Sequence, residues 1–342
     1  MHYGCMPTEA AAPTMTRPTI ALFAGDPAGI GPELTARLLT DPEASRKADV
    51  VLIGQHAQFP GLPAAVRQHA WSGLNAPAFE RARAGADNGR YMVDGLAQGL
   101  DLVRRGDADA LCFAPLNKGA LRAGGMHEED ELRWFARRLD FDGVCGELNV
   151  LRRLWTARVT SHVPLREVSA LITPAKIADV IALITGALRA SGVARPRIAV
   201  CGLNPHNGDN GNYGDEEGRL IEPGVRLAAE RGCPADGPFP ADTAFVRAIR
   251  EDGGYDGVVT MYHDQGQIAM KLMGFEQGVT VHGGLPVPIT TPAHGTAYDI
   301  AGQGKANPQA MKNAFDLAVR MGAAHRARRT GAVEPAATGA RP

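Results

Sequence analysis

Short apolar runs of β type alternate along this chain with longer segments of helical periodicity, and this alternation constrains the fold more than any other feature. In the helical segments, apolar side chains recur every three or four residues, the spacing of one buried helix face. Such alternation is typical of an α/β fold with a largely parallel sheet. The expected strands are 19–24, 50–53, 110–113, 157–161, 197–202 and 257–261, and the expected helices are 32–39, 89–105, 175–190, 242–250 and 308–326.

Length and composition exclude several classes of protein. The 342 residues suffice for two domains of about 150 residues each. Lys and Arg number 36 against 37 Asp and Glu, a net charge of −1, which argues against a nucleic-acid or anionic-membrane partner. No apolar run is long enough to cross a membrane, and residues 1–17 lack the apolar core of a secretory signal. We therefore expect a cytoplasmic protein, with mobile tails at 1–17 and 327–342.

The five cysteines are scattered and form no C-x-x-C motif, so a disulfide framework or a thiolate zinc site is not expected. Any bound metal then falls to histidines and carboxylates. Three histidines, His162, His206 and His263, each lie at the carboxyl end of a predicted strand. Ligands of open α/β sheets bind outside those ends, so the three side chains could converge.

Three neutral imidazoles with one vacant coordination position are typical of a catalytic Zn²⁺ or a similar divalent metal. The alternative is that each histidine caps its strand or bonds to the backbone, which is the more ordinary role for any one of them. Their shared placement favours the metal. Asp264, next to His263, could orient a ligand, act as a base or cap its loop.

Glycine-rich segments follow two of the expected strands. Residues 25–33 open a helix, but their spacing is not the dinucleotide-binding G-x-G-x-x-G, so no such fingerprint is assigned. The loop 202–217 is rich in Gly and Asn and contains His206, which indicates an active-site loop rather than a plain surface loop. A third glycine-rich segment spans 291–307.

Six motifs in order resemble the 4-hydroxythreonine-4-phosphate dehydrogenase family over roughly residues 19–325. They are 25–33, 114–118, 161–165, 202–206, 261–266 and 294–297. Residues 294–307 are also similar to the adenosine-binding loop of isopropylmalate dehydrogenases, which share the fold. The resemblance implies an isocitrate/isopropylmalate dehydrogenase-like α/β fold of two domains with an active-site cleft between them. Residues 18–125 with 285–326 would bind NAD, and 126–284 would hold substrate, metal and dimer contacts.

The resemblance further implies an NAD-dependent, metal-dependent oxidation of a secondary alcohol, with decarboxylation of the resulting β-keto acid, by a homodimer. His162 and His206 of one subunit and His263 of the other would hold the metal, for which Zn²⁺ is expected. Lys271 matches a lysine that contacts substrate, and Asp256 and Asp264 match acidic residues near the reacting centre. The cofactor-binding residues expected from the family are Asn204, His294, Gly295, Thr296, Asp299 and Asn307, and Asn117 and Lys118 are expected to contact substrate.

The sequence departs from this family's pattern at the phosphate-binding end. His127 and Glu128 stand where the family carries Gly-His-Thr-Glu, Ile289 replaces an Arg, and Ala293 and Thr280 replace an Asp and an Asn. These exchanges remove hydrogen-bond donors and add negative charge, which serves a dianionic phosphate poorly. The departures therefore favour a different substrate.

The preferred hypothesis is a carboxylated aromatic cis-dihydrodiol, because the terephthalate cis-dihydrodiol dehydrogenases resemble this sequence. Oxidation and loss of CO₂ would leave a catechol, so rearomatisation would drive the reaction. His127 and His282 lie beside the altered positions and would bind a second carboxylate or the ring edge. Arg133 and Arg137, one helical turn apart, fit either that role or a solvated helix face equally well.

Two alternatives stay open. One is a dehydrogenase of 4-hydroxythreonine 4-phosphate in pyridoxal phosphate synthesis, or of a four-carbon sugar-acid phosphate. The other is a metal- and ligand-binding α/β protein without catalysis, against which the three histidines with Lys271 and Asp264 argue.

Overall fold

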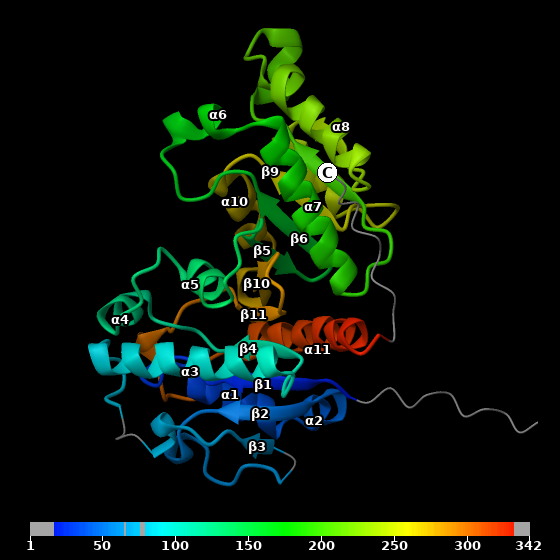
Figure 1. The fold of residues 1–342 in the computed structure, drawn as a ribbon. Helices are drawn as coiled ribbons and strands as arrows, with labels where there is room; N and C mark the ends of the chain where they lie inside the picture. Colours follow the sequence, from blue (N-terminus) through cyan, green and yellow to red (C-terminus); the bar gives the residue numbers. More distant parts are fainter. Residues whose placement is uncertain (1–16, 65, 76–78, 332–342) are drawn as a thin grey trace, which may run out of the picture.

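The computed structural model describes residues 17–64, 66–75 and 79–331, which form one mixed sheet with helices on both faces (Figure 1). The strand order is β3-β2-β1-β4-β11-β10-β5-β6-β9-β7-β8. The strands are β1 (Thr19–Phe23), β2 (Asp49–Ile53), β3 (Val66–Gln68), β4 (Ala110–Phe113), β5 (Gly146–Leu151), β6 (Leu154–Arg158), β7 (Ile198–Cys201), β8 (Asp236–Phe239), β9 (Gly257–Thr260), β10 (Val279–Gly283) and β11 (Ile289–Pro292).

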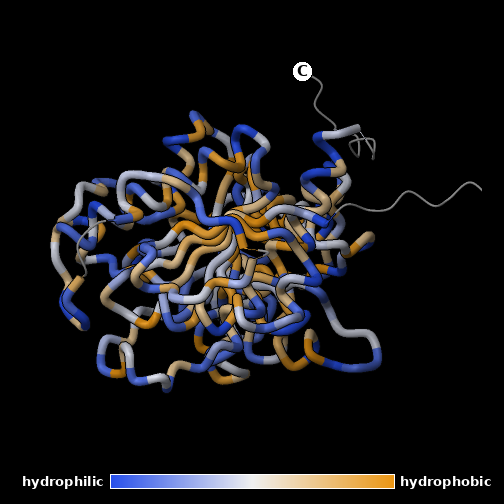
Figure 2. Tube along the Cα trace, turned by 90° about the horizontal axis from the view of Figure 1, so that it is seen from below, coloured by the Kyte–Doolittle hydropathy of each residue, from blue (hydrophilic) through white to orange (hydrophobic). Residues whose placement is uncertain are grey.

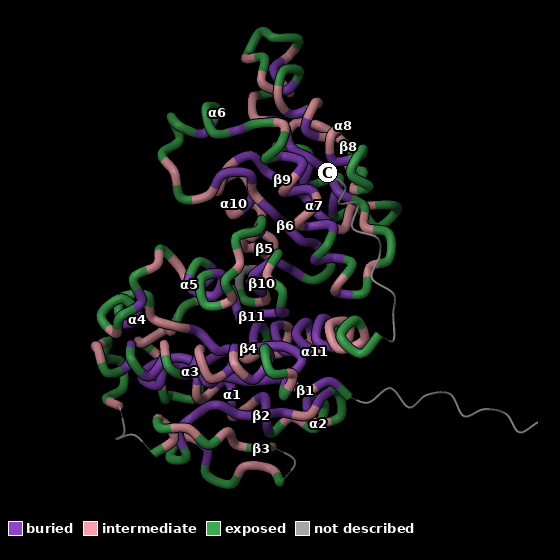
Figure 3. The backbone as a smooth tube through the Cα atoms, in the orientation of Figure 1, coloured by how far each residue is buried: buried purple, intermediate pink, exposed green. Residues whose placement is uncertain are grey.

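The helices lie on both faces of this sheet, and Figure 3 shows their inner sides and the strands buried. They are α1 (Gly31–Thr40), α2 (Pro42–Lys47), α3 (Ala86–Arg105), α4 (Lys118–Ala123), α5 (Glu131–Arg138), α6 (Val168–Leu171), α7 (Pro174–Ala190), α8 (Glu222–Glu230), α9 (Ala241–Ala248), α10 (His263–Gly274) and α11 (Gln309–Arg329).

Strand β1 shows why the sheet is covered on both faces. Ile20 and Leu22 pack in the cluster that includes residues of α1 and α11, whereas Ala21 and Phe23 pack in the cluster that includes residues of α3. Successive side chains of a strand point to opposite faces, so a strand that is apolar at every position needs both faces covered. In Figure 2 the interior strands are accordingly among the most hydrophobic parts of the chain.

Two parallel groups of strands flank an antiparallel centre. In the first group β3, β2, β1, β4 and β11 pair in parallel, each with its neighbour in this order. In the second group β6, β9, β7 and β8 pair in parallel in the same way. Strands β10 and β5 join the two groups through antiparallel pairs with β11, with each other and with β6. The predicted α/β class with a largely parallel sheet is therefore confirmed, and the positions of the two domain boundaries stay a prediction.

The expected elements are found within a few residues, with two corrections. Strand β6 begins at Leu154 rather than at 157, because Leu154 and Trp155 are buried against the sheet. Helix α11 continues to Arg329, so 327–329 are not a tail: Arg329 Nη2 donates to Asp109 Oδ1 over 3.0 Å. Residues 1–16 and 332–342, the rest of the predicted tails apart from 17, 330 and 331, lie outside the described residues.

The sequence predicts that no segment crosses a membrane, and the described helices bear on this prediction. None of them alone is long and apolar enough to cross a membrane. The segments Leu165–Leu171 and Pro174–Ala190 reach the required length and composition only together, and they are bent by 95° relative to each other.

Candidate active site

A cleft of about 340 Å³ lies beside the antiparallel centre of the sheet. Its walls come from β5, β6, β10, the start of α4, helix α10 and the loop that follows β11. Of the residues predicted to form the site, those that line this cleft are Lys118, His162, His263, Lys271, His282, His294 and Gly295.

The structure brings His162 and His263 together. Each follows the carboxyl end of a strand, and the two strands, β6 and β9, are parallel neighbours in which Arg158 pairs with Thr260. The ring centroids lie 5.7 Å apart. His263 Nδ1 lies 2.7 Å from Asp264 Oδ1, an arrangement that fixes the ring and leaves Nε2 available to a ligand.

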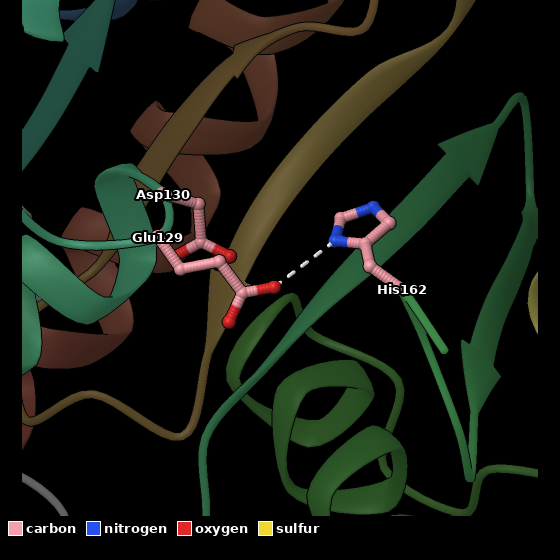
Figure 4. Close-up of side chains that lie close together, drawn as sticks. All are labelled: Glu129, Asp130 and His162. Atoms are coloured by element: carbon pink, nitrogen blue, oxygen red, sulfur yellow. Dashed lines mark ion pairs between the residues drawn. The ribbon is translucent and has the colours of Figure 1, made fainter. Parts of the chain in front are cut away.

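Two carboxylates outside the predicted set of site residues lie beside His162 (Figure 4). One potential ligand atom from each of Glu129, Asp130 and His162 lies within 4.8 Å of the others, and Glu129 Oε1 is 3.5 Å from His162 Nδ1. Asp130 also caps α5, where its Oδ1 accepts from the Arg133 backbone N–H over 2.8 Å. Imidazole nitrogens and carboxylate oxygens together suit a divalent metal. The acidic run 128–131 was the signal that could have found them.

His206 is not gathered with the other two histidines in one chain, at least among the described residues. It begins a turn of five consecutive left-handed residues, from His206 (φ 53°) to Asn210 (φ 58°). Glu217, buried behind this loop, accepts from the backbone N–H groups of Leu203 and Asn204 over 2.8 and 2.7 Å. Left-handed turns of non-glycine residues are strained and tend to occur at functional sites, in keeping with an active-site loop.

How the three histidines are divided between subunits stays a prediction. His162 and His263 meet within a single chain, because β6 and β9 are adjacent, whereas the division from the resemblance assigned His263 to the other subunit. The histidine that lies apart is His206.

The floor of the cleft is a hydrogen-bonded polar network on the antiparallel strands. We define the cleft floor as Glu147 and Asn149 of β5, Arg158 of β6, and Thr280 and His282 of β10. Arg158 Nη2 donates to Glu147 Oε2 over 2.7 Å, and its Nη1 donates to Asn149 Oδ1 over 3.1 Å. Asn149 Nδ2 donates to Thr280 Oγ1 over 3.4 Å. His282 stands opposite Glu147, and Thr280 opposite Asn149, in the β10–β5 register, which places all four side chains on one face.

His282 is the most buried titratable side chain of this floor, 4% exposed. Its ring stacks on Phe113 at a centroid distance of 5.8 Å and meets Phe135 edge-on at 5.4 Å. Burial lowers the pKa of His282, although Glu147 and Glu131 act in the opposite direction. Burial alone would raise the pKa of Glu147, but the charges of Arg158 and of His282 when protonated hold it below its usual value.

The remaining predicted substrate and catalytic residues are dispersed. Asn117 caps α4 by accepting from the Ala120 N–H over 2.9 Å, and it is not among the residues that line the cleft. His127 is exposed and is not among the residues that line the cleft, whereas Glu131, the first residue of α5, does line it, so the substrate role of His127 stays a prediction. Asp256 precedes β9, at the end opposite His263, and accepts from the Arg197 backbone N–H over 2.9 Å.

Arg133 and Arg137, for which the sequence favours neither a substrate-binding role nor a solvated helix face, have different hydrogen-bond partners. Arg137 Nη1 donates to Glu128 Oε1 over 2.8 Å, whereas Arg133 Nη1 donates to Cys145 Sγ over 3.3 Å. Neither lines the main cleft.

The predicted cofactor residues gather in the loop after β11, except for Asn204. This loop packs against the glycine-rich turn after β1: Ile30 N–H donates to the Thr296 carbonyl over 3.1 Å, and a Cβ at Gly29 would lie 2.9 Å from Thr296 Cβ. Asp299 and Asn307 are exposed, and Asn307 Nδ2 donates to Glu276 Oε2 over 3.0 Å. Asn204 lies elsewhere and donates to Glu216 Oε2 over 2.7 Å.

Comparison with known proteins places this architecture among dehydrogenases. The sequence model of the pyridoxal phosphate biosynthetic protein PdxA matches residues 37–318. The putative 4-hydroxythreonine-4-phosphate dehydrogenase 2 of Pseudomonas aeruginosa is 52% identical over 327 residues, covering 89% of this chain and 97% of that protein. The D-threonate 4-phosphate dehydrogenase of Salmonella typhimurium is 34% identical over 330 residues, covering 90% and 100%.

Solved structures give the same grouping. The 4-hydroxythreonine-4-phosphate dehydrogenase of Klebsiella pneumoniae is similar with a TM-score of 0.77 at 32% identity, covering 90% of this chain and 98% of that one. The terephthalate 1,2-cis-dihydrodiol dehydrogenase of Burkholderia xenovorans reaches 0.64 at 26%, covering 89% and 98%. An isocitrate dehydrogenase from Methylococcus capsulatus, at 0.50 and 17% with coverage of 91% and 88%, shares the fold.

These comparisons overturn the predicted aromatic dihydrodiol substrate. The relatives with the higher identities are named for phosphorylated four-carbon acids, and the dihydrodiol dehydrogenase is the more distant structure. The prediction rested on lost phosphate donors, but sequence alone could not show which cations the cleft keeps. Lys118, Arg158 and Lys271 all line it.

Proposed function

The chain belongs to the family of the pyridoxal phosphate biosynthetic protein PdxA, and from this premise we propose that it is a dehydrogenase of a phosphorylated four-carbon hydroxy acid. The proposed substrates are 4-hydroxythreonine 4-phosphate and a sugar-acid phosphate such as D-threonate 4-phosphate. The proposed reaction is the oxidation of a secondary alcohol with NAD(P)⁺ as the hydride acceptor.

One observation carries the proposal: a single cleft holds His162 and His263 in contact and Lys271 on the same wall as His263. Lys271 lies eight residues after His263 on α10, about two helical turns, or roughly 12 Å, along the axis. The long Lys271 side chain spans part of that separation, so the reacting alcohol of a small acid would lie at the histidines and its phosphate at the Lys271 ammonium.

The histidines fit a divalent metal. His263 is oriented by Asp264 and has Nε2 available, and His162 has the carboxylates of Glu129 and Asp130 beside it. We propose His162 and His263 as ligands from one chain, with His206 of a second copy completing the set in a homodimer. Zn²⁺ is the proposed ion because its preferred ligands are of these types. Such a metal, when bound, lowers the pKa of the alcohol and so favours its oxidation.

Other side chains in and beside the cleft orient a proposed metal ligand or supply charge to the substrate. Asp264 fixes the His263 ring through the 2.7 Å contact at Nδ1. Lys271 and Lys118 bring positive charge to an anionic substrate, and both are exposed to the cleft. Arg158 compensates Glu147 in the cleft floor, so that this carboxylate does not repel the substrate.

For the cofactor we propose the surface where the loop after β11 meets the turn after β1. His294, Gly295 and Thr296 lie there, beside Gly29, and the turn leads into the amino end of α1. Backbone N–H groups at a helix start suit a pyrophosphate. The side chain of Asp26 in this turn is held by Tyr298, whose hydroxyl donates to its Oδ2 over 2.6 Å.

The proposal is tested by incubating the purified protein with Zn²⁺, Mn²⁺ or Mg²⁺, NAD⁺ or NADP⁺, and each of the two phosphorylated acids, and following NAD(P)H absorbance. We expect turnover with at least one acid, loss of turnover with EDTA, and recovery on readdition of the metal. CO₂ release, measured in parallel, tests the decarboxylation that the resemblance implied. Absence of turnover with both acids, with every metal and both cofactors, would contradict the proposal.

A further inference from the structure

His282 presents an unusual combination in this cleft: it is buried with both ring nitrogens closed to solvent, it is among the residues that line the cavity, and neither ring nitrogen has a hydrogen-bond partner. A buried imidazole normally donates from one nitrogen and accepts at the other. An unpaired buried polar group costs free energy, and such a group on a cavity wall is therefore suited to a partner that arrives with a ligand. Phe113 and Phe135 hold the ring from two sides, so it cannot readily turn to find a protein partner.

The charges around His282 indicate what kind of group that ligand presents. Glu147 stands directly opposite it in the sheet, and Glu131 reaches the same wall from α5. Both carboxylates are close enough to raise the pKa of the ring. They are the acidic residues among the described side chains that line the cleft, so its negative charge is concentrated around His282.

Each of these two carboxylates forms an ion pair with one cationic side chain. Arg158 pairs with Glu147 at 2.7 Å, and Lys118 Nζ lies 4.0 Å from Glu131 Oε2. Asp130 adds a third negative charge near the ring, so no cation around His282 is in surplus, and burial disfavours the protonated form of the ring. A phosphate or a carboxylate brought to this wall would lie near two carboxylates without a surplus cation. A hydroxyl or an ammonium group could instead donate hydrogen bonds to the Glu131 and Glu147 carboxylates, and the neutral His282 ring could accept a hydrogen bond from it or donate one to a hydroxyl oxygen.

This inference rests on the proposed function, because the substrate class limits which group can lie there. The proposed acids carry a carboxylate at C1, a secondary alcohol at C3 and a phosphate at C4. The remaining polar group is the C2 substituent, an amino group in 4-hydroxythreonine 4-phosphate and a hydroxyl in D-threonate 4-phosphate. It bears no negative charge in either acid.

We propose that His282 is a specificity-determining residue that hydrogen-bonds the amino or hydroxyl group on C2 of the substrate. In this arrangement the C2 substituent lies between His282 and the carboxylates Glu131 and Glu147. The phosphate lies toward Lys271, on the far side of the reacting alcohol. A substrate without a C2 substituent would leave the buried ring unpaired and would be rejected for that reason.

The test is a cycle of two enzymes and two substrates. The enzymes are the wild type and His282→Phe, which keeps the aromatic packing and removes both nitrogens. The substrates are whichever proposed acid is turned over and 3-hydroxy-4-phosphooxybutanoate, which lacks the C2 substituent. We expect the wild type to prefer the acid with the C2 substituent by about 10- to 100-fold in kcat/KM. We expect His282→Phe to lose most of that preference, while its kcat/KM for the acid without the C2 substituent stays within about twofold of the wild-type value.

Further variants separate contact from structure. His282→Gln, which can donate and accept, should restore part of the preference. His56→Phe, which replaces an exposed histidine outside the cleft, should leave both values unchanged. An equal loss on both substrates, or none on either, would overturn the proposal.

A readout without turnover distinguishes this inference from the proposed function. In the metal-loaded protein, the His282 ring ¹⁵N signals, assigned by their absence from His282→Phe, should shift on addition of 4-hydroxythreonine 4-phosphate but not of 3-hydroxy-4-phosphooxybutanoate. A selective shift without NAD(P)H formation would support the His282 contact and refute the dehydrogenase. Turnover with no selective shift would refute the contact and leave the dehydrogenase standing.

Discussion

Arg158 and Glu147 form an ion pair in the cleft floor, with Nη2 and Oε2 2.7 Å apart and side chains only 9% and 19% exposed. The two residues lie on adjacent antiparallel strands, β6 and β5, and Arg158 also donates to Asn149. A pair this buried is costly to break, because each charge would remain without its partner.

Arg158→Met should therefore destabilise the protein by about 3–5 kcal/mol, mostly through the unpaired Glu147 carboxylate. Urea unfolding followed by circular dichroism measures this loss. The double variant Arg158→Met with Glu147→Gln should recover a large part of it, since no isolated charge remains. If the double variant is as unstable as the single one, the loss comes from packing rather than from charge.

Asp264→Asn should weaken metal binding by about 10- to 100-fold, because Asp264 orients the His263 ring through Nδ1. Calorimetric titration of the metal-free protein with Zn²⁺ measures the dissociation constant directly. Asp252→Asn, at an exposed carboxylate paired with Arg250, is the matched control and should bind the metal as the wild type does. Equal affinity in Asp264→Asn would show that this contact does not support a metal ligand.

Lys271→Met should raise KM for the phosphorylated acid by about 10- to 100-fold, with a smaller effect on kcat, because a charge-assisted contact to phosphate is worth about 1.5–3 kcal/mol. Steady-state kinetics at saturating cofactor and metal give both constants. Lys271→Arg keeps the charge and should retain most of the affinity. A fall in kcat with KM unchanged would instead assign Lys271 to the chemical step.

Acidification should destabilise the protein through His282. Burial lowers the pKa of His282 below its ordinary value of 6.5, so the unfolded state binds the proton first as pH falls. The contribution of His282 to the free energy of unfolding is then fully present above pH 6.5, and it declines as the pH falls from there toward the pKa of His282 in the folded state. Urea midpoints between pH 7.5 and 5.5 should fall for the wild type and fall less for His282→Phe.

His325 contributes in the same direction, because burial also lowers its pKa, so part of the decline should persist in His282→Phe. Comparison with His325→Phe separates the two contributions. A pH dependence identical in wild type and His282→Phe would show that His282 is protonated to the same degree in both states.

Much of the fold follows from local pattern. Strands such as β4, apolar at every position, and helices with one apolar face, such as α3, are defined by residues close in sequence, and their alternation specifies an α/β sheet. The three central strands β5, β10 and β11 were missed. Two of them, β5 and β10, carry polar side chains such as Glu147 and His282 on the face toward the cleft, and this breaks the apolar run that identifies a buried strand.

The candidate site was only partly contained in the sequence. The position of each histidine after a strand marked the correct edge of the sheet, and the motif order identified the family. The contact of His162 with His263, the recruitment of Glu129, Asp130 and Glu131, and the position of His127 outside the cleft lining depended on strand order and on where α5 begins. Those are long-range relationships. Sequence determined which local elements form and which residue types they carry, whereas pairing between distant strands decided which side chains share one cleft, because that pairing is set by packing over the whole sheet.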